Sequence, residues 1–280
     1  MALKLRRWRA RDLVFELGAR TLLMGVLNAT PDSFSDGGKF LDPAAALAHA
    51  RAMIAEGADI IDIGGESTRP GSAHVSAEDE IGRIRPVAAA VAREPGAVVS
   101  IDTYKAAVAK VALDAGAHIV NDVWGFRKDA DIARVAADSG AGVILMHNRE
   151  KDDPGVDMVA EVIGFLSRSV EIALGAGVAE DRIVVDPGIG FGKTHRQSME
   201  LIARLGEIGA ALGFPILLGA SRKRFVGHAT GVEAPTERLY GTLAAHLKGV
   251  EAGAAIIRAH DVKPHRQALD MLDAIRSTVT

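Results

Sequence analysis

The sequence predicts an α/β protein that folds as a single (β/α)8 barrel over residues 1–280. The main indication is a recurring unit, in which a helical stretch ends in Gly-Ala and a short run of β-branched residues follows. Counting the less regular copies gives eight candidate strands. Eight such units suit a closed barrel, which commonly fills about 250 residues. An open, doubly wound sheet is the structural alternative.

The predicted elements begin with a short hairpin in residues 1–18. Hydrophobic and charged residues alternate there at residues 3–5 and 14–16, which predicts two strands that cap the floor of the barrel. The barrel strands are then expected near residues 21–27, 59–63, 97–102, 117–121, 142–146, 182–186, 215–219 and 255–258.

The outer helices are expected in alanine-rich stretches between these strands, for example residues 43–56 and 235–251. Asp42 followed by Pro43 is typical of a helix start, with a capping side chain and a proline in the first turn. Strands that alternate with helices are parallel and joined by crossovers. Since no linker or low-complexity stretch interrupts the series, one domain is predicted.

Composition excludes several classes of protein. Aromatic residues make up 4% and the net charge is −3, which argues against a nucleic-acid-binding surface. The absence of cysteine excludes disulfides, thiolate metal sites and cysteine nucleophiles. No apolar stretch follows the basic residues near the start, and no run of 18 apolar residues occurs, so neither a signal peptide nor a membrane span is expected. A cytoplasmic protein is predicted.

A polar or charged side chain lies at or just after the end of every predicted strand. In barrels of this kind the chemistry occurs at these C-terminal ends. A lone aspartate after a strand is more often a helix N-cap, and this alternative applies to Asp102 and Asp122. Convergence at all eight ends instead predicts a site for a polar ligand. The polar or charged residues are Asn28, Asp62, Asp102, Asn121, Asp122, His147, Asp186, Ser221, Lys223, Arg258 and His260, and Met146 also lies at the fifth strand end.

Two features indicate that part of this ligand is a phosphate or diphosphate. The stretch Ser67-Thr68-Arg69 combines hydroxyls, a cation and nearby glycines. Arg258 and His260 lie two residues apart, hence on one face of the last strand, where such barrels often bind phosphate. The alternative is a solvated arginine and a core histidine.

Residues 187–194, PGIGFGKT, come within one residue of the Walker A pattern. Proline replaces the first glycine, and the run follows the sixth predicted strand. Short patterns of this kind have many false positives, so a nucleotide-binding loop is not expected.

Five blocks, taken together, closely resemble the dihydropteroate synthases, a family of pterin-binding barrel enzymes. They span residues 25–38, 62–71, 186–191, 221–223 and 258–261, in order from the first strand to the last. The resemblance implies one pterin-binding TIM-barrel domain. It also implies a transferase of folate biosynthesis that condenses 6-hydroxymethyl-7,8-dihydropterin diphosphate with p-aminobenzoate, giving 7,8-dihydropteroate and diphosphate.

The resemblance also implies roles for individual residues. Catalysis is expected to depend on Asp102, Lys223 and Arg258. The pterin is expected to contact Asp102, Asn121, Met146, Asp186, Lys223 and Arg258. The diphosphate is expected to lie against Asn28, Thr68, Arg69, Arg258 and His260. The p-aminobenzoate pocket is expected to include Thr68, Pro70, Phe191, Lys223 and Arg224.

The resemblance further implies Mg²⁺ as cofactor, bridging Asn28 and the diphosphate. Asp32 and Asp36 are expected to act in an ordered loop and not as permanent metal ligands. The implied mechanism is substitution at the exocyclic pterin carbon, with Asp102 stabilising the cation that forms. A homodimer is expected from the family alone.

Arg224 departs from the family pattern, which often has serine at this position. If that serine binds the carboxylate of p-aminobenzoate, either the backbone N–H or the guanidinium of Arg224 replaces it. The competing functions are a methyltetrahydrofolate–corrinoid methyltransferase, a phosphosugar enzyme and an inactive pterin-binding paralogue. The long blocks after the first two strands argue against the methyltransferase, and the presence of Asp102, Lys223 and Arg258 argues against the paralogue.

Overall fold

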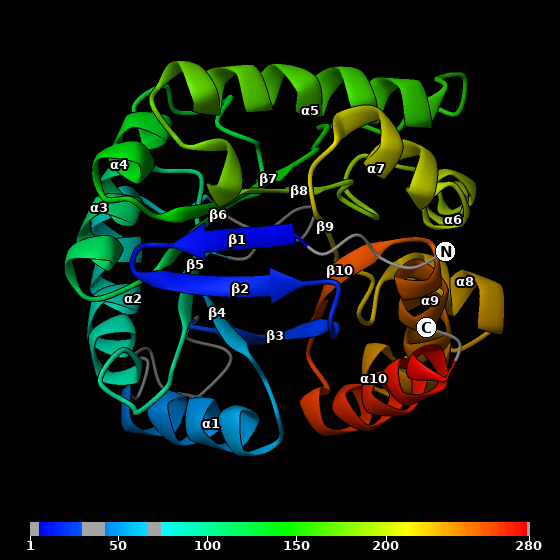
Figure 1. Ribbon diagram of the computed structural model, residues 1–280, viewed down its shortest axis with the longest axis horizontal. Coiled ribbons are helices and arrows are strands. Elements are labelled where there is room, and N and C mark those ends of the chain that lie inside the picture. Colours follow the sequence, from blue (N-terminus) through cyan, green and yellow to red (C-terminus); the bar gives the residue numbers. More distant parts are fainter. Residues whose placement is uncertain (1–5, 30–42, 67–73, 279–280) are drawn as a thin grey trace.

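The computed structural model describes residues 6–29, 43–66 and 74–278. Eight parallel strands close into a barrel in the order β10-β3-β4-β5-β6-β7-β8-β9, and helices surround it (Figure 1). The predicted barrel is confirmed, and each predicted strand overlaps an observed one. The strands are β3 (Leu22–Asn28), β4 (Ile60–Gly64), β5 (Val99–Asp102), β6 (Ile119–Asp122), β7 (Gly142–Met146), β8 (Ile183–Asp186), β9 (Ile216–Leu218) and β10 (Ala254–Ala259).

The helices of the described chain are more numerous than one per strand. Both α6 and α7 lie between β8 and β9, and both α8 and α9 lie between β9 and β10. The predicted helix over 235–251 starts as a separate 3-10 turn, η3 (Pro235–Glu237), because Arg238 leaves helical geometry. The helices are α1 (Pro43–Ala55), α2 (Ala77–Val91), α3 (Ala106–Asp114), α4 (Ile132–Asp138), α5 (Met158–Gly175), α6 (His195–Ala203), α7 (Leu205–Leu212), α8 (Arg224–Thr230), α9 (Leu239–Glu251) and α10 (Val262–Ser277), with η2 at Glu180–Arg182.

The N-terminal hairpin lies across one end of the barrel (Figure 1). It consists of β1 (Arg6–Ala10) and β2 (Leu13–Leu17), paired antiparallel. Trp8 is fully buried, belongs to a cluster with inward-facing side chains of the barrel strands, and donates from its indole to the carbonyl of Arg182 at 2.9 Å. At the start of β7, a Cβ on Gly142 would come within 2.9 Å of Ala10, so this close approach requires glycine. These contacts place the hairpin at the N-terminal ends of the strands, which leaves their C-terminal ends for the site.

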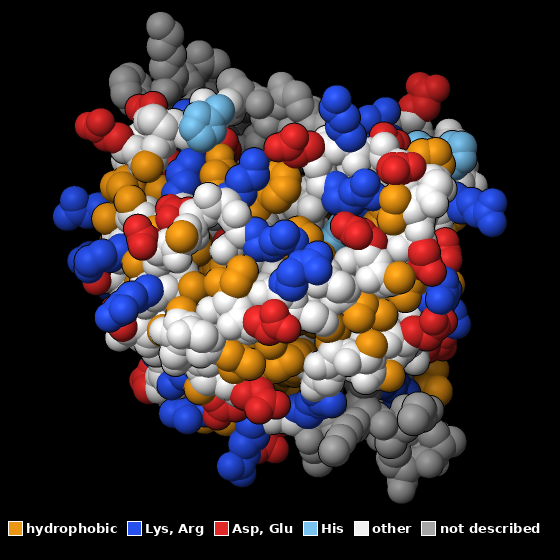
Figure 2. All heavy atoms as spheres, turned by 90° about the horizontal axis from the view of Figure 1, so that it is seen from above, with side chains coloured by type: hydrophobic (Ala, Val, Ile, Leu, Met, Phe, Trp, Pro, Cys, Tyr) orange, Lys and Arg blue, Asp and Glu red, His pale blue; other side chains and the backbone are white. Residues whose placement is uncertain are grey.

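The face that carries α5 has charges of both signs. Figure 2 shows Lys and Arg side chains interspersed with Asp and Glu there, with hydrophobic side chains scattered between them. This mixture agrees with the net charge of −3 and does not form a basic footprint on that face. Among the described residues, no helix is both long and apolar enough to cross a membrane.

Candidate functional site

A pocket lies at the C-terminal end of the barrel. Seven of the residues predicted to form the site converge on it, contributed by strands far apart in the sequence. The lining residues are Asp102, Asn121, Val123, Met146, Asp186, Phe191, Gly219, Lys223 and Arg258.

Arg258 connects two buried carboxylates in this pocket. From β10, its Nη2 donates to Asp102 Oδ2 at 2.7 Å and its Nε donates to Asp62 Oδ2 at 2.6 Å. The amide of Asn121 donates to the same Asp62 oxygen at 3.1 Å. Asp62 thus holds both a cation and an amide of the pocket from behind, whereas the sequence places it only among the polar strand-end residues of the site. The available signal was an aspartate inside the otherwise apolar strand IIDIG, fully buried in the structure.

The shared guanidinium only partly compensates the buried charge of Asp102. Burial raises the pKa of Asp102 to about 7, against the opposing effect of Arg258. Burial also raises the pKa of Asp186. Burial lowers the pKa of Arg258, but Asp62 and Asp102 outweigh it and raise that pKa above its ordinary value. The site therefore keeps a permanent cation next to Asp102, a carboxylate that titrates near neutrality.

One oxygen of Asp102 is ready to accept a hydrogen bond from a ligand. Its Oδ1 is buried and has no hydrogen-bond partner among the described residues. Such an orphaned acceptor is costly unless something pairs with it. Because Asp102 lines the pocket, a ligand with N–H donors on its edge would meet this requirement.

Asp186 and Lys223 also line the pocket. Asp186 Oδ1 accepts from the N–H of Gly188 at 2.7 Å. The ammonium of Lys223 donates to the carbonyl of Ile189 and lies 4.3 Å from the centre of the Phe191 ring. Burial lowers the pKa of Lys223 to about 8, so its charge is also set near neutrality.

The loop after β8 packs directly against the chain after β7. A Cβ on Gly188 would come within 1.9 Å of the carbonyl oxygen of His147, and one on Gly192 within 2.4 Å of that of Arg149. Both glycines have positive φ. The glycines of the Walker-like run therefore serve a close approach of two backbones.

The lysine of that run, Lys193, is bonded to protein groups and does not project into the pocket. Lys193 is buried and its ammonium binds His147 Nδ1 at 2.8 Å and the Phe191 carbonyl at 2.9 Å. Thr194 caps α6 in a capping box with Gln197. The run thus shapes the wall that carries Phe191, in agreement with the prediction that it is not a nucleotide-binding loop.

The two aspartates that had a capping alternative differ. The carboxylate of Asp122 accepts from the N–H groups of Trp124 and Phe126 at 2.7 and 2.8 Å, so its role is to hold a turn. Asp102 caps no helix, because the N–H of Ala106 at the start of α3 donates to Asp129 at 2.8 Å.

The remaining predicted residues lie around the mouth of the barrel or outside the described chain. Asn28 is exposed at the end of β3, and His260, after β10, binds Ser221 Oγ through Nδ1 at 3.0 Å. Arg224 is exposed as the first residue of α8 and does not line the pocket. The predictions that fall outside the described residues concern Asp32, Asp36, Thr68, Arg69 and Pro70.

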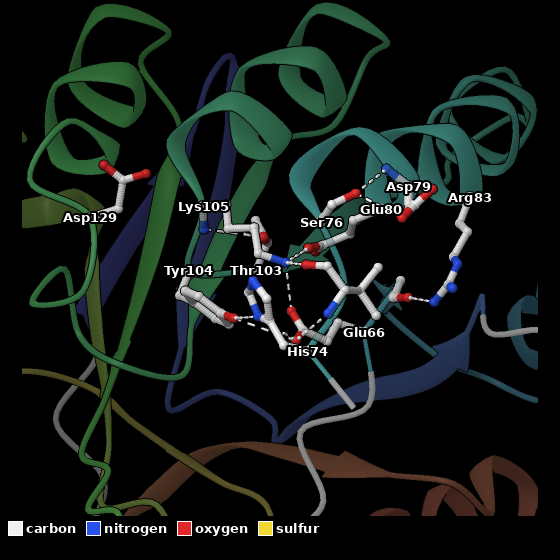
Figure 3. Close-up of polar contacts among 12 residues, drawn as sticks. Glu66, His74, Ser76, Asp79, Glu80, Arg83, Thr103, Tyr104, Lys105 and Asp129 are labelled. Carbon is white, nitrogen blue, oxygen red and sulfur yellow. Dashed lines mark hydrogen bonds and ion pairs between the residues drawn. The ribbon is translucent and has the colours of Figure 1, made fainter. Parts of the chain in front are cut away.

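A buried ion cluster forms from residues that follow β4 and β5 in the chain, together with Glu80 of α2 (Figure 3). The Lys105 ammonium donates to Glu66 at 2.6 Å, to Glu80 at 2.5 Å and to the carbonyl of Val75 at 2.7 Å. Tyr104 contacts both Glu66 and His74 in the same view. One cation therefore holds together residues on both sides of the stretch 67–73.

Comparison with known proteins gives consistent matches over nearly the whole chain. The family model described as "Pterin binding enzyme" matches residues 24–260. A dihydropteroate synthase of Clostridium beijerinckii is 47% identical over 262 residues, covering 93% of this chain and 96% of that one. The structure of the Xanthomonas albilineans dihydropteroate synthase with 4-aminobenzoic acid has a TM-score of 0.92 at 40% identity and covers 98% and 99% of the two chains. That of Thermus thermophilus in complex with 6HMPPP has a TM-score of 0.85 at 44% identity and covers 96% and 100%.

Proposed function

Because the chain belongs to the dihydropteroate synthase family of pterin-binding enzymes, we propose that its pocket joins 6-hydroxymethyl-7,8-dihydropterin diphosphate to p-aminobenzoate. The products are 7,8-dihydropteroate and diphosphate, and the enzyme is a transferase of folate biosynthesis. The observation that carries the proposal is the Asp62–Arg258–Asp102 arrangement in a pocket that also holds Asn121 and Lys223.

The pocket complements the edge of a pterin ring. The 2-amino group and ring N–H are donors, and Asp102, Asn121 and Asp186 present acceptor oxygens. Met146 contributes an apolar surface to the lining, and the planar guanidinium of Arg258 can stack on the ring. Buried acceptors of this kind reject analogues that lack the matching N–H groups.

The chemistry follows from where charge develops. The bond between the exocyclic carbon and the diphosphate oxygen breaks, and its electron pair leaves with the diphosphate. Asp102, as a carboxylate, stabilises the positive charge that spreads over the pterin. The arylamine then forms the new C–N bond and loses a proton. Since the amine is itself the nucleophile, the pocket needs no covalent intermediate, and Arg258 supplies a cation for the departing diphosphate.

We extend the proposal to Mg²⁺ as cofactor. Asn28 is exposed at the C-terminal end of β3, and its amide oxygen is the hard donor that Mg²⁺ prefers. A site with few protein ligands suits this ion, because the diphosphate and water supply the rest. When bound, Mg²⁺ neutralises charge on the leaving group. Thr68 and Arg69 for the diphosphate, Thr68 and Pro70 for p-aminobenzoate, and Asp32 and Asp36 as loop residues stay predictions.

The p-aminobenzoate pocket is proposed to lie against Phe191 and Lys223, which are in contact with each other. Arg224 follows Lys223 directly and is exposed, so both its N–H and its guanidinium remain candidates for the carboxylate. A homodimer is also proposed. Its support is that the neighbouring helices α9 and α10 both expose large hydrophobic side chains, Tyr240 on α9 and Met271 and Ile275, one turn apart, on α10. A cytoplasmic location stays a prediction.

The test is a direct assay with Mg²⁺, 6-hydroxymethyl-7,8-dihydropterin diphosphate and p-aminobenzoate. Matched amounts of diphosphate and dihydropteroate are expected, with no dihydropteroate when p-aminobenzoate is omitted. Asp102→Asn should lower kcat by about 10²–10³-fold, because it removes the charge that stabilises the cation. Tight binding of the pterin diphosphate without product would instead indicate an inactive paralogue. Methyl transfer from methyltetrahydrofolate to a corrinoid would indicate the methyltransferase.

A further inference from the structure

Two buried histidines link the loops after β9 and β10, although neither lines the pocket. His246 lies on α9 and His265 on α10, and both side chains are fully buried. The N–H of Ala220 donates to His246 Nε2 at 2.8 Å, and His246 Nδ1 lies 2.9 Å from His265 Nε2. His265 Nδ1 in turn lies 2.6 Å from the carbonyl oxygen of Asp261.

The partners at the two ends determine where the protons are. A backbone N–H only donates, so His246 Nε2 must be the bare acceptor and Nδ1 must carry the proton. A carbonyl only accepts, so His265 Nδ1 carries the proton and Nε2 is bare. The central bond then runs from His246 Nδ1–H to His265 Nε2, with every donor and acceptor satisfied. Burial lowers the pKa of both rings, so this neutral arrangement persists at pH 7.

The same face of α9 makes a second bond to the loop after β9. Thr242, one turn before His246, accepts from the N–H of Arg222 through Oγ1 at 3.1 Å. Two buried acceptors on one helix thus bind alternate N–H groups of the turn that leads to Lys223. Arg222 itself adopts a φ of 59°, which a residue with a side chain reaches only when its surroundings hold it there.

The loop after β10 is tied to the same turn. The guanidinium of Arg222 pairs with the carboxylate of Asp261, with Nε 3.0 Å from Oδ2. Ser221 Oγ accepts from the N–H of His260 at 3.2 Å. The turn 219–223 and the residues that follow Arg258 therefore form one hydrogen-bonded unit behind the pocket.

We propose that His246 and His265 are positioning residues that hold the turn after β9 against the loop after β10, and so place Lys223 and Arg258 for the reaction. The inference rests on the proposed function, since both cations are assigned to its substrates. The His246 ring acts through Ala220 N–H, three residues before Lys223. The His265 ring fixes the tautomer that makes this possible, because a proton on His246 Nε2 would oppose the N–H of Ala220.

The test compares variants of His246 with a control on the same helix. His246→Leu removes the acceptor for Ala220 and should lower kcat/KM by about 10- to 100-fold, the effect of misplacing a group in a site by about 1 Å. His246→Gln keeps an acceptor in reach and should recover most of that loss. His265→Leu removes the acceptor that keeps the proton on His246 Nδ1, and its kcat/KM should lie between those of His246→Leu and His246→Gln. Val250→Ala, fully buried one turn after His246, should lower Tm but keep kcat/KM within about two-fold.

An independent readout is the ¹⁵N NMR spectrum of the wild-type imidazoles, which reports the tautomer without any activity measurement. Both rings should carry the proton on Nδ1 between pH 6 and 8. The proposal is overturned by an Nε2-protonated ring at either position, by wild-type kinetics in His246→Leu, or by an equal kinetic loss in Val250→Ala. If His246→Leu fails to fold, His246→Gln and the spectrum decide. Product formation by the wild-type enzyme tests the proposed function separately.

Discussion

Two residues of the pocket, Asp102 and Lys223, have pKa values that determine the pH range in which both are charged. Asp102 and Lys223 both titrate near neutrality because the protein removes them from water, and neither is fully compensated by Arg258 or Asp186. Groups shifted in this way mark sites where charge is used. A carboxylate and an ammonium with pKa values of about 7 and about 8 coexist in their charged forms only within a narrow range of pH.

The pH dependence of catalysis follows from these two groups. As pH falls through about 7, Asp102 takes up a proton and loses the charge that stabilises the pterin cation. As pH rises through about 8, Lys223 loses its charge. A bell-shaped profile of kcat/KM with its maximum between these values is therefore expected. In Lys223→Arg the alkaline limb should move upward, because arginine stays protonated. A profile that is flat from pH 6 to 9 would contradict this assignment.

Arg224 offers a second test at a single residue. If its guanidinium binds the carboxylate of p-aminobenzoate, Arg224→Ala should raise the KM for p-aminobenzoate by about ten-fold or more, the loss of one charged hydrogen bond. If the backbone N–H binds it, the KM should stay within about two-fold. Arg224→Ser would restore the family residue. Steady-state kinetics with either substrate varied distinguish these results, and the KM for the pterin diphosphate is the internal control.

At the scale of elements, buried ion pairs connect residues that follow a strand with residues at the starts of helices. Lys105, which directly precedes α3, holds Glu66 beyond β4 and Glu80 in α2 (Figure 3). Burial raises the pKa of Lys105's partner Glu80, whereas the hydrogen bond from Lys105 helps to lower that of Glu66 against burial. One ammonium thus connects the segment after β4, helix α2 and the start of α3.

Removing that ammonium should be costly. Lys105→Met leaves two buried carboxylates without a cation, and breaking such a pair typically costs about 3–5 kcal/mol. Lys110→Met is the matched control, because it removes an exposed pair with Asp114 on the same helix and should cost less than about 1 kcal/mol. Urea denaturation measures both. Adding Glu66→Gln and Glu80→Gln to Lys105→Met should recover part of the loss; equal effects at positions 105 and 110 would refute the role of burial.

The elements also show how far a local pattern reaches. The recurring Gly-Ala units correctly predicted the barrel strands, because glycine ends a helix and an apolar run suits a strand buried on both faces. The helix expected over 235–251 starts only at Leu239. Arg238 breaks it, and its guanidinium binds the carbonyls of Val232 and Arg222 at 3.0 and 3.1 Å. Those contacts depend on the tertiary structure, and the spacing of residues along the sequence does not predict them.

At the scale of the whole molecule, the barrel has a closed end and an open end. The hairpin lies at the N-terminal ends of the strands, with Trp8 among inward-facing residues such as Met24, Ile60 and Ile144. The pocket lies at the other end. This division agrees with a fold in which one face provides stability and the other provides chemistry.

The stabilising role of the hairpin is testable through Trp8. Trp8→Ala removes a fully buried ring and its hydrogen bond to Arg182, and should lower the free energy of unfolding by about 3–5 kcal/mol. Val14→Ala, at a side chain 53% exposed on the same hairpin, should change it by less than about 0.5 kcal/mol. At temperatures where the variant stays folded, kcat should be unchanged. A lower kcat in folded Trp8→Ala than in the wild type would show that the hairpin also affects the pocket.

The proposed homodimer is tested on α9 and α10. Met271→Glu together with Ile275→Lys places charges at two exposed hydrophobic positions one turn apart on α10. The wild type is expected to sediment as a dimer and this variant as a monomer, because a symmetric interface carries each change twice. Leu174→Lys, at an exposed leucine on α5, is the control and should remain dimeric. A monomeric wild type would end the proposal.

The sequence by itself determined the class of the fold, the positions of the barrel strands and most of the residues that meet in the pocket. These follow from local patterns, and in a parallel barrel every strand end points to the same face. Only the tertiary structure decided that Asp62 shares Arg258 with Asp102, that Lys193 is buried against His147, and that two histidines connect the last loops. Asp62 and Arg258 lie 196 residues apart, and a hydrogen bond between such positions has no signature in a local pattern.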